Sequence, residues 1–232
     1  MRGAYLRFGD GDVFLLTGLN EAYQSADSHL AIEMQQAFAL HGPGIMKCLM
    51  IHTAQFGLWP GMAPGIHEVE DATARHLLSN TYKYFIGNVI YSPVALPYAA
   101  VFQPQLAIEF LKFLKTSNPV LFVGNRDIPD EIVCRLFGPI PRVPTPSSNS
   151  FTEIARIEAD IQSVLDSHSK RFGIIITAMG CSGRPLAKRI YSQGYNVFIF
   201  DFGSLLDAFC GWNTRTWIRI APTDVRWLLN EI

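Results

Sequence analysis

Two aspartates near the start of the sequence have the spacing of a cation site. Asp10 and Asp12 are separated only by Gly11, and they follow an aromatic and apolar run, Tyr5–Phe8, that ends at Gly9. The run predicts a buried strand, and the glycines predict a tight turn that can aim both carboxylates at one point. Mg²⁺ and Mn²⁺ prefer such oxygen ligands, and Gly11 would let a bulky anion approach the backbone. A Gly-Asp-Gly-Asp segment is also typical of a surface turn, so the pair alone leaves both interpretations open.

A second candidate site is a glycine turn in the last third of the chain. The turn Gly180–Gly183 follows a predicted strand, Phe172–Met179, and precedes a helix and a further strand that ends at Asp201. Free amide groups at a helix start suit a phosphate, and Ser182 adds a hydroxyl. The turn is one substitution from the dinucleotide fingerprint Gly-x-Gly-x-x-Gly, with Asp201 near the position of a ribose-binding acid. Close packing of a strand on a helix explains the same glycines, so the turn by itself does not identify a ligand.

Strands and helices alternate along the whole chain, and several strands are apolar throughout. This pattern predicts an α/β fold: a Rossmann-like, doubly wound, mostly parallel sheet with helices on both faces, in a single domain over residues 1–232. The expected elements are strand 5–8, an apolar piece 13–16, a helix capped by Asp27, strand 45–51, loop 52–64, helix 68–85, strand 88–92, helix 103–115, strand 119–125, helix 130–137, a proline-rich loop 139–146, a helix from 150, strand 172–179, helix 184–193 and strand 196–200.

Two of these helices carry specific expectations. In the helix 103–115, we expect an apolar stripe formed by Leu106, Phe110, Leu111 and Leu114. The segment Ser150–Glu153 has the signature of a capping box, followed by a regular stripe of aliphatic residues.

Composition excludes several classes of protein. The 232 residues are 49% hydrophobic and 17% charged, with a net charge of -1, so nonspecific binding to nucleic acid is not expected. The four cysteines lack metal-ligand spacing and predict reduced thiols. No apolar run reaches the ~18 residues of a membrane span. We therefore expect a soluble, cytoplasmic protein.

The candidate residues all follow predicted strands, so they should gather along the carboxyl edge of the sheet. They include the Asp10 turn, His52 and Gln55 in the long loop, Asn125 after a middle strand, and the Gly180 turn. A dehydrogenase does not need paired acids after its first strand. A nucleotide-sugar enzyme must neutralise a diphosphate leaving group, and a cation held by two acids can do so.

The chain resembles the glycosyltransferases of the GT-D type, which have their own variant of the Rossmann-like fold. The block Arg7-Phe8-Gly9-Asp10-Gly11-Asp12 is similar to the family's Arg-Phe-Gly-Asp-Gly-Glu block, with its acid-x-acid motif. Further similar blocks are Val123-Gly124-Asn125, the run from Ile174 to Gly183, Gly194-Tyr195-Asn196-Val197 and Asp201-Phe202-Gly203-Ser204. They occur in the family's order and span nearly the whole chain. Asp12 replaces the family's glutamate, and Ser204 and Asp207 stand where some members have a histidine-containing block.

The resemblance implies a metal-dependent transfer of sugar from a nucleoside diphosphate sugar, most simply a UDP-sugar, to a glycan, glycoprotein or other hydroxyl acceptor. Asp10 and Asp12 would bind Mn²⁺ or Mg²⁺ and the donor diphosphate, and Arg7, Gly9 and Gly11 would shape their turn. The turn Gly180–Gly183, with Ser182, would line the nucleotide pocket, as would Asn125. Positive charge could come from Arg7, Arg126 or Arg184, and a general base from Asp201 or Asp207.

Two other functions fit parts of the sequence. An NAD-type dinucleotide-binding oxidoreductase would use the Gly180 turn and Asp201, and a noncatalytic nucleotide-sugar-binding module would keep the fold without a base. Trp59, Trp212, Trp217 and Trp227 could form an acceptor surface or the interface of a homo-oligomer, but in so apolar a chain such residues are more often core or cover residues.

Overall fold

One parallel sheet organises the part of the chain that the structure describes. The computed structural model describes residues 2–16, 18–49, 95–168 and 171–232. Within these ranges six strands pair in the order β2-β1-β6-β5-β3-β4, and every pair is parallel. The predicted Rossmann-like α/β class is therefore confirmed. The strands are β1 (Gly3–Phe8), β2 (Ile45–Leu49), β3 (Pro119–Asn125), β4 (Arg142–Thr145), β5 (Gly173–Ala178) and β6 (Val197–Asp201).

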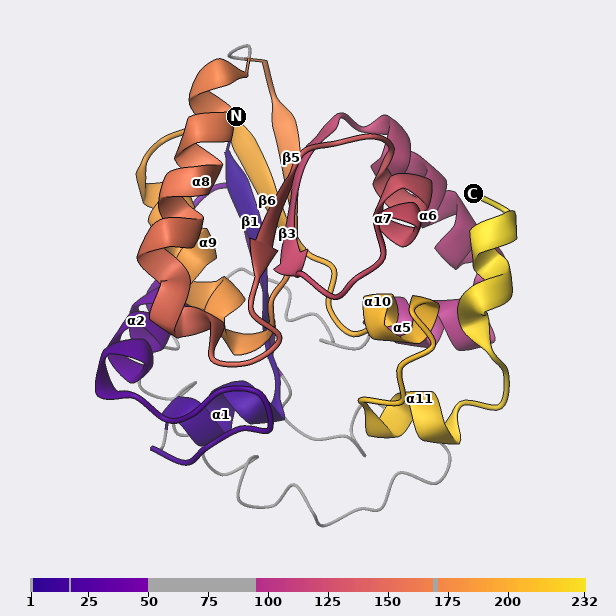
Figure 1. The fold of residues 1–232 in the computed structure, drawn as a ribbon, viewed down its shortest axis with the longest axis horizontal. Helices are drawn as coiled ribbons and strands as arrows, with labels where there is room; N and C mark the ends of the chain where they lie inside the picture. Colours follow the sequence, from indigo (N-terminus) through magenta and orange to yellow (C-terminus); the bar gives the residue numbers. More distant parts are fainter. Residues whose placement is uncertain (1, 17, 50–94, 169–170) are drawn as a thin grey trace.

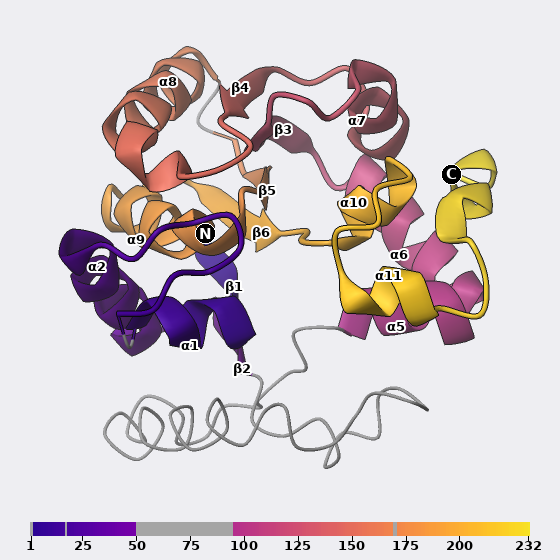
Figure 2. The same cartoon turned by 60° about the horizontal axis from the view of Figure 1, so that its bottom comes forward.

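Helices cover both faces of this sheet (Figures 1 and 2). The described helices are α1 (Asp10–Leu16), α2 (Ser28–Ala39), α5 (Ala95–Phe102), α6 (Pro104–Thr116), α7 (Asp130–Phe137), α8 (Ile154–Ser167), α9 (Gly183–Ser192), α10 (Leu205–Phe209) and α11 (Thr216–Ile220), with the 3₁₀ helices η2 (Ser150–Glu153), η3 (Gly180–Ser182) and η4 (Val225–Asn230).

Two hydrophobic clusters fill the space between the sheet and its helices. On one face, α2, α8 and α9 pack on the sheet through residues such as Phe38, Ile157 and Leu186. On the other face, α5, α6, α7, α10 and η4 pack around aromatic side chains that include Phe122 and Phe202. Helices α1, α10 and α11 lie at the carboxyl end of the strands, where the candidate residues are expected (Figure 1).

Several elements lie where the sequence predicts them. Strand β3 and helix α7 coincide with the predicted ranges 119–125 and 130–137. Asp27 caps α2, because its Oδ1 accepts a hydrogen bond from the Leu30 N–H at 2.9 Å. The strand, helix and strand unit of β5, α9 and β6 is present, and β5 and β6 are parallel. These elements carry strong local signals, which explains why the sequence is sufficient to place them.

The predicted acidic turn at Asp10 and the apolar piece 13–16 that follows it have a different structure from the one expected. Asp10 to Leu16 form one helix, α1, directly after Gly9. A short apolar run does not distinguish a strand from a helix, and the decision comes from packing. Leu15 is buried in a small cluster with Leu30 and Met34 of α2 and Cys181 of the turn after β5. Helix α1 therefore joins α2 to the Gly180 turn.

Three further predictions were wrong in part. Leu106 in α6 is 53% exposed, because the buried side is formed by Ala107, Ile108, Leu111 and Leu114. The capping box is not formed, since the Ser150 hydroxyl donates to the Pro146 carbonyl and a 3₁₀ turn precedes α8. The proline-rich loop contains an edge strand, β4. Prolines are tolerated at a sheet edge, where one side of the strand needs no hydrogen bonds.

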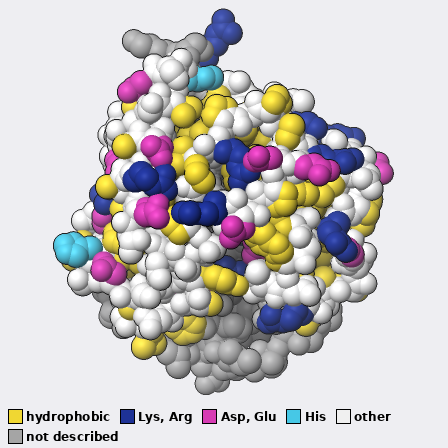
Figure 3. Space-filling view, in the orientation of Figure 1, with side chains coloured by type: hydrophobic (Ala, Val, Ile, Leu, Met, Phe, Trp, Pro, Cys, Tyr) yellow, Lys and Arg dark blue, Asp and Glu magenta, His cyan; other side chains and the backbone are white. Residues whose placement is uncertain are grey.

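Some predictions fall outside the described residues. These are His52, Gln55, the loop 52–64, the helix 68–85 and the strand 88–92. Among the described helices, none is long and apolar enough to cross a membrane. Basic and acidic side chains are interspersed on the face that Figure 3 presents, which agrees with the net charge of -1.

Candidate functional site

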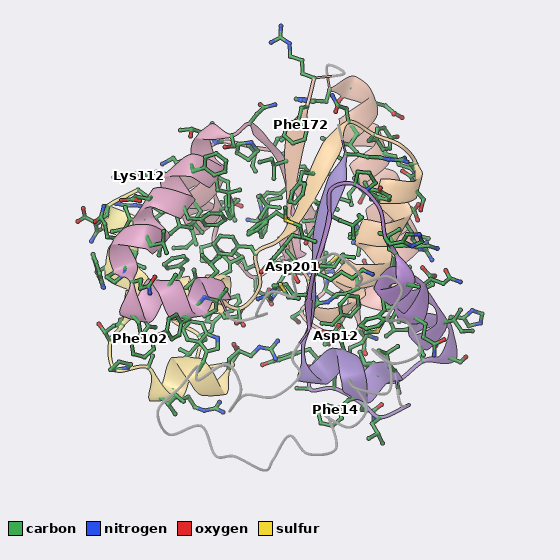
Figure 4. The ribbon with its side chains drawn as sticks, turned by 180° about the vertical axis from the view of Figure 1, so that it is seen from behind. Asp12, Phe14, Phe102, Lys112, Phe172 and Asp201 are labelled. Carbon is green, nitrogen blue, oxygen red and sulfur yellow. The ribbon has the colours of Figure 1, made fainter. Side chains whose placement is uncertain are left out.

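Four charged side chains meet at the carboxyl ends of three adjacent strands. Arg7 lies near the end of β1, Asp12 lies in α1 after β1, Arg184 follows β5, and Asp201 ends β6. Strands β1, β6 and β5 are neighbours in the sheet, so parallel pairing brings these segments to one edge (Figure 4 labels Asp12 and Asp201). Their alternating charges form a chain of ion pairs.

Asp12 is the most deeply buried acid of this chain, with 2% of its surface exposed. Its Oδ2 accepts the Gly9 N–H at 2.8 Å and pairs with the Arg184 guanidinium at 3.0 Å. Its Oδ1 is also buried and has no hydrogen-bond partner among the described residues. The carboxylate is thus fixed through one oxygen, while the other oxygen can accept a further ligand.

Arg184 holds the two acids together. Its Nη2 donates to Asp12, and its Nη1 lies 3.2 Å from Asp201 Oδ2 and donates to the Gly180 carbonyl at 2.5 Å. The side chain is 8% exposed, so both carboxylates rely on it for compensation of their buried charge. A planar guanidinium presents its five donors in a fixed fork that can reach several acceptors in different directions, a geometry that a lysine ammonium does not have.

Arg7 continues the chain on the other side of Asp201. Its Nε donates to Asp201 Oδ2 at 3.1 Å. Gly203, in the turn after β6, has a φ of +70°, and a Cβ at this position would overlap with the Arg7 guanidinium. A glycine is therefore required both by the backbone conformation and by the approach of the arginine.

A second group of charges lies beside this chain. Arg215 lies 3.6 Å from Glu21 and 3.9 Å from Asp207, measured between nitrogen and oxygen atoms. Asp207 also accepts a hydrogen bond from the Thr214 hydroxyl at 2.6 Å. Burial raises the pKa of Asp207, while Thr214, Arg215 and Arg7 oppose this rise. The influence of Arg7 on Asp207 links the two groups.

The described cluster is nearly balanced in charge. Four acids (Asp12, Asp201, Asp207 and Glu21) face three arginines (Arg7, Arg184 and Arg215), so their formal sum is -1. The described residues contain no group of three or more His, Cys, Asp or Glu that could hold a metal ion by itself. A cation at this edge would therefore need ligands beyond the described protein groups.

Burial raises the pKa of Asp12 to about 6, although Arg184 and the Gly9 N–H favour the charged form. The ordinary value is 3.8, so the folded protein binds this proton more tightly than the unfolded chain does. The stability that the protonated Asp12 contributes is fully present below about pH 4 and is lost as pH rises through about 6. This loss lowers the free energy of unfolding by about 3 kcal/mol.

This shift gives a prediction for metal-free buffer that contains EDTA. Between pH 4 and pH 8, the free energy of unfolding of the wild type should fall by about 3 kcal/mol relative to that of Asp12→Asn. Asparagine does not titrate, so the pH dependence that the other groups contribute cancels when the free energies of unfolding of the two proteins are subtracted. Urea unfolding at a series of pH values measures it. Parallel curves for the two proteins would contradict the assignment of the raised pKa.

The fold and the cluster can now be compared with known proteins. A family model described as "Glycosyltransferase GT-D fold" matches residues 5–216, which include every member of the cluster. The chain belongs to this family. No curated protein sequence matches it significantly.

Three solved structures are similar in fold to this chain. A selenomethionine-substituted domain of unknown function 1792 has a TM-score of 0.64 at 20% identity, covering 88% of this chain and 73% of its own. A structure titled as a new glycosyltransferase from Streptococcus sanguinis has a TM-score of 0.59 at 18% identity, and the match covers 88% of this chain and 75% of that structure. A third, titled as a domain with a distinct glycosyltransferase fold, has a TM-score of 0.60 at 20% identity, and the match covers 87% of this chain and 72% of that structure. At these identities the likeness shows the fold.

The structure brings together part of the site that the sequence of this GT-D protein suggests. Arg7 pairs directly with Asp201, and Arg184 joins Asp201 to Asp12. Asp207 lies close enough to Arg7 for their charges to interact. The backbone of Asp10 begins α1, and its side chain lies outside the described part. Whether the two acids converge therefore stays a prediction.

The glycines of the site have different roles. Gly9 holds Asp12 through its N–H, and Gly11 leaves room for Glu21, whose Cγ would lie 2.5 Å from a Cβ at position 11. Gly180 has a φ of +61° and presents its carbonyl to Arg184, while Gly183 begins α9.

Three other predicted residues are engaged within the protein. The Ser182 hydroxyl is buried and donates to Gln24 Oε1 at 2.9 Å. Asn125 accepts the Asp127 N–H through its side chain. Arg126 is exposed and lies 3.8 Å from Glu153. No ion pair links Asn125 or Arg126 to the cluster among the described contacts.

Sequence reasoning missed Glu21 and Gln24. For Arg215, in the polar segment Asn213-Thr214-Arg215-Thr216, the sequence allows a phosphate contact or a surface turn and favours the turn. The segment between α1 and α2 carries no motif, yet its Gln24 contacts the Gly180 turn and its Glu21 contacts Gly11 and Arg215. Only the return of the chain across the carboxyl edge places these residues in the site.

Proposed function

We propose that this GT-D protein transfers a sugar from a nucleoside diphosphate sugar, most simply a UDP-sugar, to a hydroxyl of a glycan, glycoprotein or other acceptor. The observation that carries the proposal is the cluster of Arg7, Asp12, Arg184 and Asp201 at the carboxyl edge of β1, β6 and β5. This edge is where open α/β sheets bind their ligands. Family membership supports the class of reaction.

The cluster fits a divalent cation in one respect. Asp12 Oδ1 is a buried carboxylate oxygen without a hydrogen-bond partner among the described residues, and such an atom suits Mn²⁺ or Mg²⁺. Asp12 and Asp10 would hold the ion together with the phosphates of the donor. When bound, the ion would offset the charge that develops on the departing diphosphate.

The arginines of the cluster have distinct tasks in this proposal. Arg184 keeps Asp12 ionised and oriented, because its guanidinium compensates the charge of the carboxylate in a buried position. Arg7 fixes Asp201 and brings positive charge to the side of Asp207. Positive groups that are already oriented stabilise a developing negative charge without further reorganisation.

Asp207 is a better general base than Asp201 in this geometry. Asp201 Oδ2 is already engaged by Arg7 and Arg184 at 3.1 and 3.2 Å, so this oxygen is not free to contact an acceptor hydroxyl. Burial raises the pKa of Asp207, which favours proton uptake from an acceptor hydroxyl. A base is required if the transfer inverts the anomeric centre.

Donor turnover and nucleotide binding test the proposal. We expect the purified protein to release UDP from at least one sugar of a donor panel in Mn²⁺ or Mg²⁺, and to lose this activity in EDTA. Titrations with UDP and with NAD, each with and without Mn²⁺, provide the comparison. Metal-dependent UDP binding without turnover on any donor would indicate a noncatalytic binding module. Metal-independent NAD binding without UDP binding would overturn the proposal in favour of an oxidoreductase.

A further inference from the structure

Arg215 is the most loosely held arginine of the cluster. Its guanidinium lies 3.6 Å from Glu21 and 3.9 Å from Asp207, distances that exceed those of direct charge-assisted hydrogen bonds. It also lies over the Tyr23 ring, with its Cζ 5.2 Å from the ring centroid. Its side chain is 36% exposed, compared with 13% for Arg7 and 8% for Arg184. Arg215 can therefore move at a lower cost than the two buried arginines.

Glu21 is the fixed partner of this pair. Its Oε2 accepts the Tyr23 N–H at 2.9 Å, and its side chain is 10% exposed. It packs against Gly11, between the two acids of the first turn. Glu21 thus holds Arg215 beside the turn where the donor diphosphate is proposed to bind, and Gln24 anchors the same segment to Ser182.

The position of Arg215 also relates it to the transfer step. Its second partner is Asp207, which we propose as the base that faces the acceptor hydroxyl. In a nucleoside diphosphate sugar, the phosphate attached to the sugar is the terminal one of the diphosphate. Of the two phosphates, the terminal one lies nearer to the base, because it is attached to the sugar carbon that the acceptor attacks. Arg215 lies between this base and Glu21 beside the Gly11 turn, so it is placed to reach the terminal phosphate, and a guanidinium is well suited to bind it.

We infer that Arg215 binds the terminal phosphate of the donor diphosphate and that Glu21 competes with the phosphate for this arginine. The inference rests on the proposed function and names a specificity residue within it. Phosphate binding would exchange the long contact with Glu21 for short charge-assisted hydrogen bonds. Glu21 thereby sets how readily the diphosphate binds, and it favours release of the product after transfer.

Calorimetric titration with nucleotides tests this inference. The probe is the nucleoside diphosphate that the wild type binds most tightly among UDP, GDP, CDP, ADP and dTDP, together with its monophosphate. Arg215→Gln should weaken diphosphate binding by about tenfold or more, because a hydrogen bond to a charged group is lost, and should change monophosphate binding by less than about twofold. Arg215→Lys should restore part of the affinity. Arg226→Gln, an exposed arginine of η4 that pairs with Asp224, is the matched control and should leave both affinities unchanged.

The competition is tested by a double-mutant cycle with Glu21. Glu21→Gln should strengthen diphosphate binding by about threefold or more, and it should have no such effect in the Arg215→Gln background. Thermal unfolding of each variant verifies that it is folded.

Two results would overturn the inference while the proposed function stands. One is unchanged diphosphate affinity in Arg215→Gln, and the other is an effect of Glu21→Gln that persists without Arg215. A wild type that binds none of the five nucleotides and uses no sugar donor would instead refute the proposed function, and the inference with it.

Discussion

Replacement of Arg184 by leucine is expected to lower the free energy of unfolding by about 3 to 5 kcal/mol. The buried guanidinium compensates two carboxylates, Asp12 and Asp201, that are 2% and 8% exposed. Leucine fills much of the space but leaves both acids without that partner, and it also leaves the Gly180 carbonyl without its donor. Urea unfolding followed by circular dichroism at pH 7.5 measures the loss. Protonation of Asp12 would remove one of the two uncompensated charges, so the Arg184→Leu variant should be more stable at low pH than at pH 7.5.

Arg156→Leu is the matched control for this prediction. Arg156 also pairs with two acids, Glu153 and Asp160, but its side chain is 41% exposed. Exposed ion pairs contribute little, so this variant should lose no more than about 1 kcal/mol. Equal losses in the two variants would show that burial of the Arg184 network does not determine its contribution.

Replacement of Asp12 by asparagine is expected to reduce kcat/KM for donor turnover by at least about 100-fold. The amide keeps the shape of the side chain and can still contact Arg184, but it lacks the charge that a divalent cation requires. Asp10→Asn is expected to lose activity to a similar extent, because the proposal assigns the cation to both acids. Release of UDP at saturating Mn²⁺ measures both variants, with the donor that the wild type uses.

Asp127→Asn serves as the control, since Asp127 is exposed in the turn between β3 and α7 and should retain turnover within about twofold of the wild type. Full turnover in both Asp10→Asn and Asp12→Asn would show that neither acid takes part in catalysis. Loss in Asp12→Asn alone would assign Asp12 to the arginine network and remove Asp10 from the site.

Arg184→Leu and Asp12→Asn are expected to differ in their effects on stability, because Asp12 is buried. Its burial makes ionisation unfavourable, which raises its pKa, and Arg184 offsets only part of that cost. A charged carboxylate in such a position lowers stability at neutral pH. We therefore expect Asp12→Asn to reduce activity without a comparable loss of stability, whereas Arg184→Leu should reduce stability directly.

Strong local signals allowed several elements to be predicted from the sequence. The seven-residue apolar strand β3 ends in Asn125 as predicted, and helix α7 occupies the predicted residues. Asp27 at the start of α2 marks a helix end because its carboxylate satisfies a free backbone N–H. These features depend on neighbours within a few residues, which a sequence displays directly.

Elements that depend on distant contacts were predicted less well. The run after Gly11 forms a helix because Leu15 packs against α2 and Cys181. The edge strand β4 exists because β3 offers it a partner, despite the prolines. In both segments local preference is weak, and tertiary packing determines the conformation.

The sequence by itself determined the parallel α/β class, the order of its strong elements and the carboxyl edge at which Arg7, Asp12 and Asp201 would lie. Only the tertiary structure decided that Arg184 joins Asp12 to Asp201 and that Arg215 lies between Glu21 and Asp207. The physical reason is that periodicity and turn chemistry are local, whereas an ion pair between Asp12 and Arg184 spans 172 positions. Such a pair forms only where strands that are remote in sequence become neighbours in the sheet.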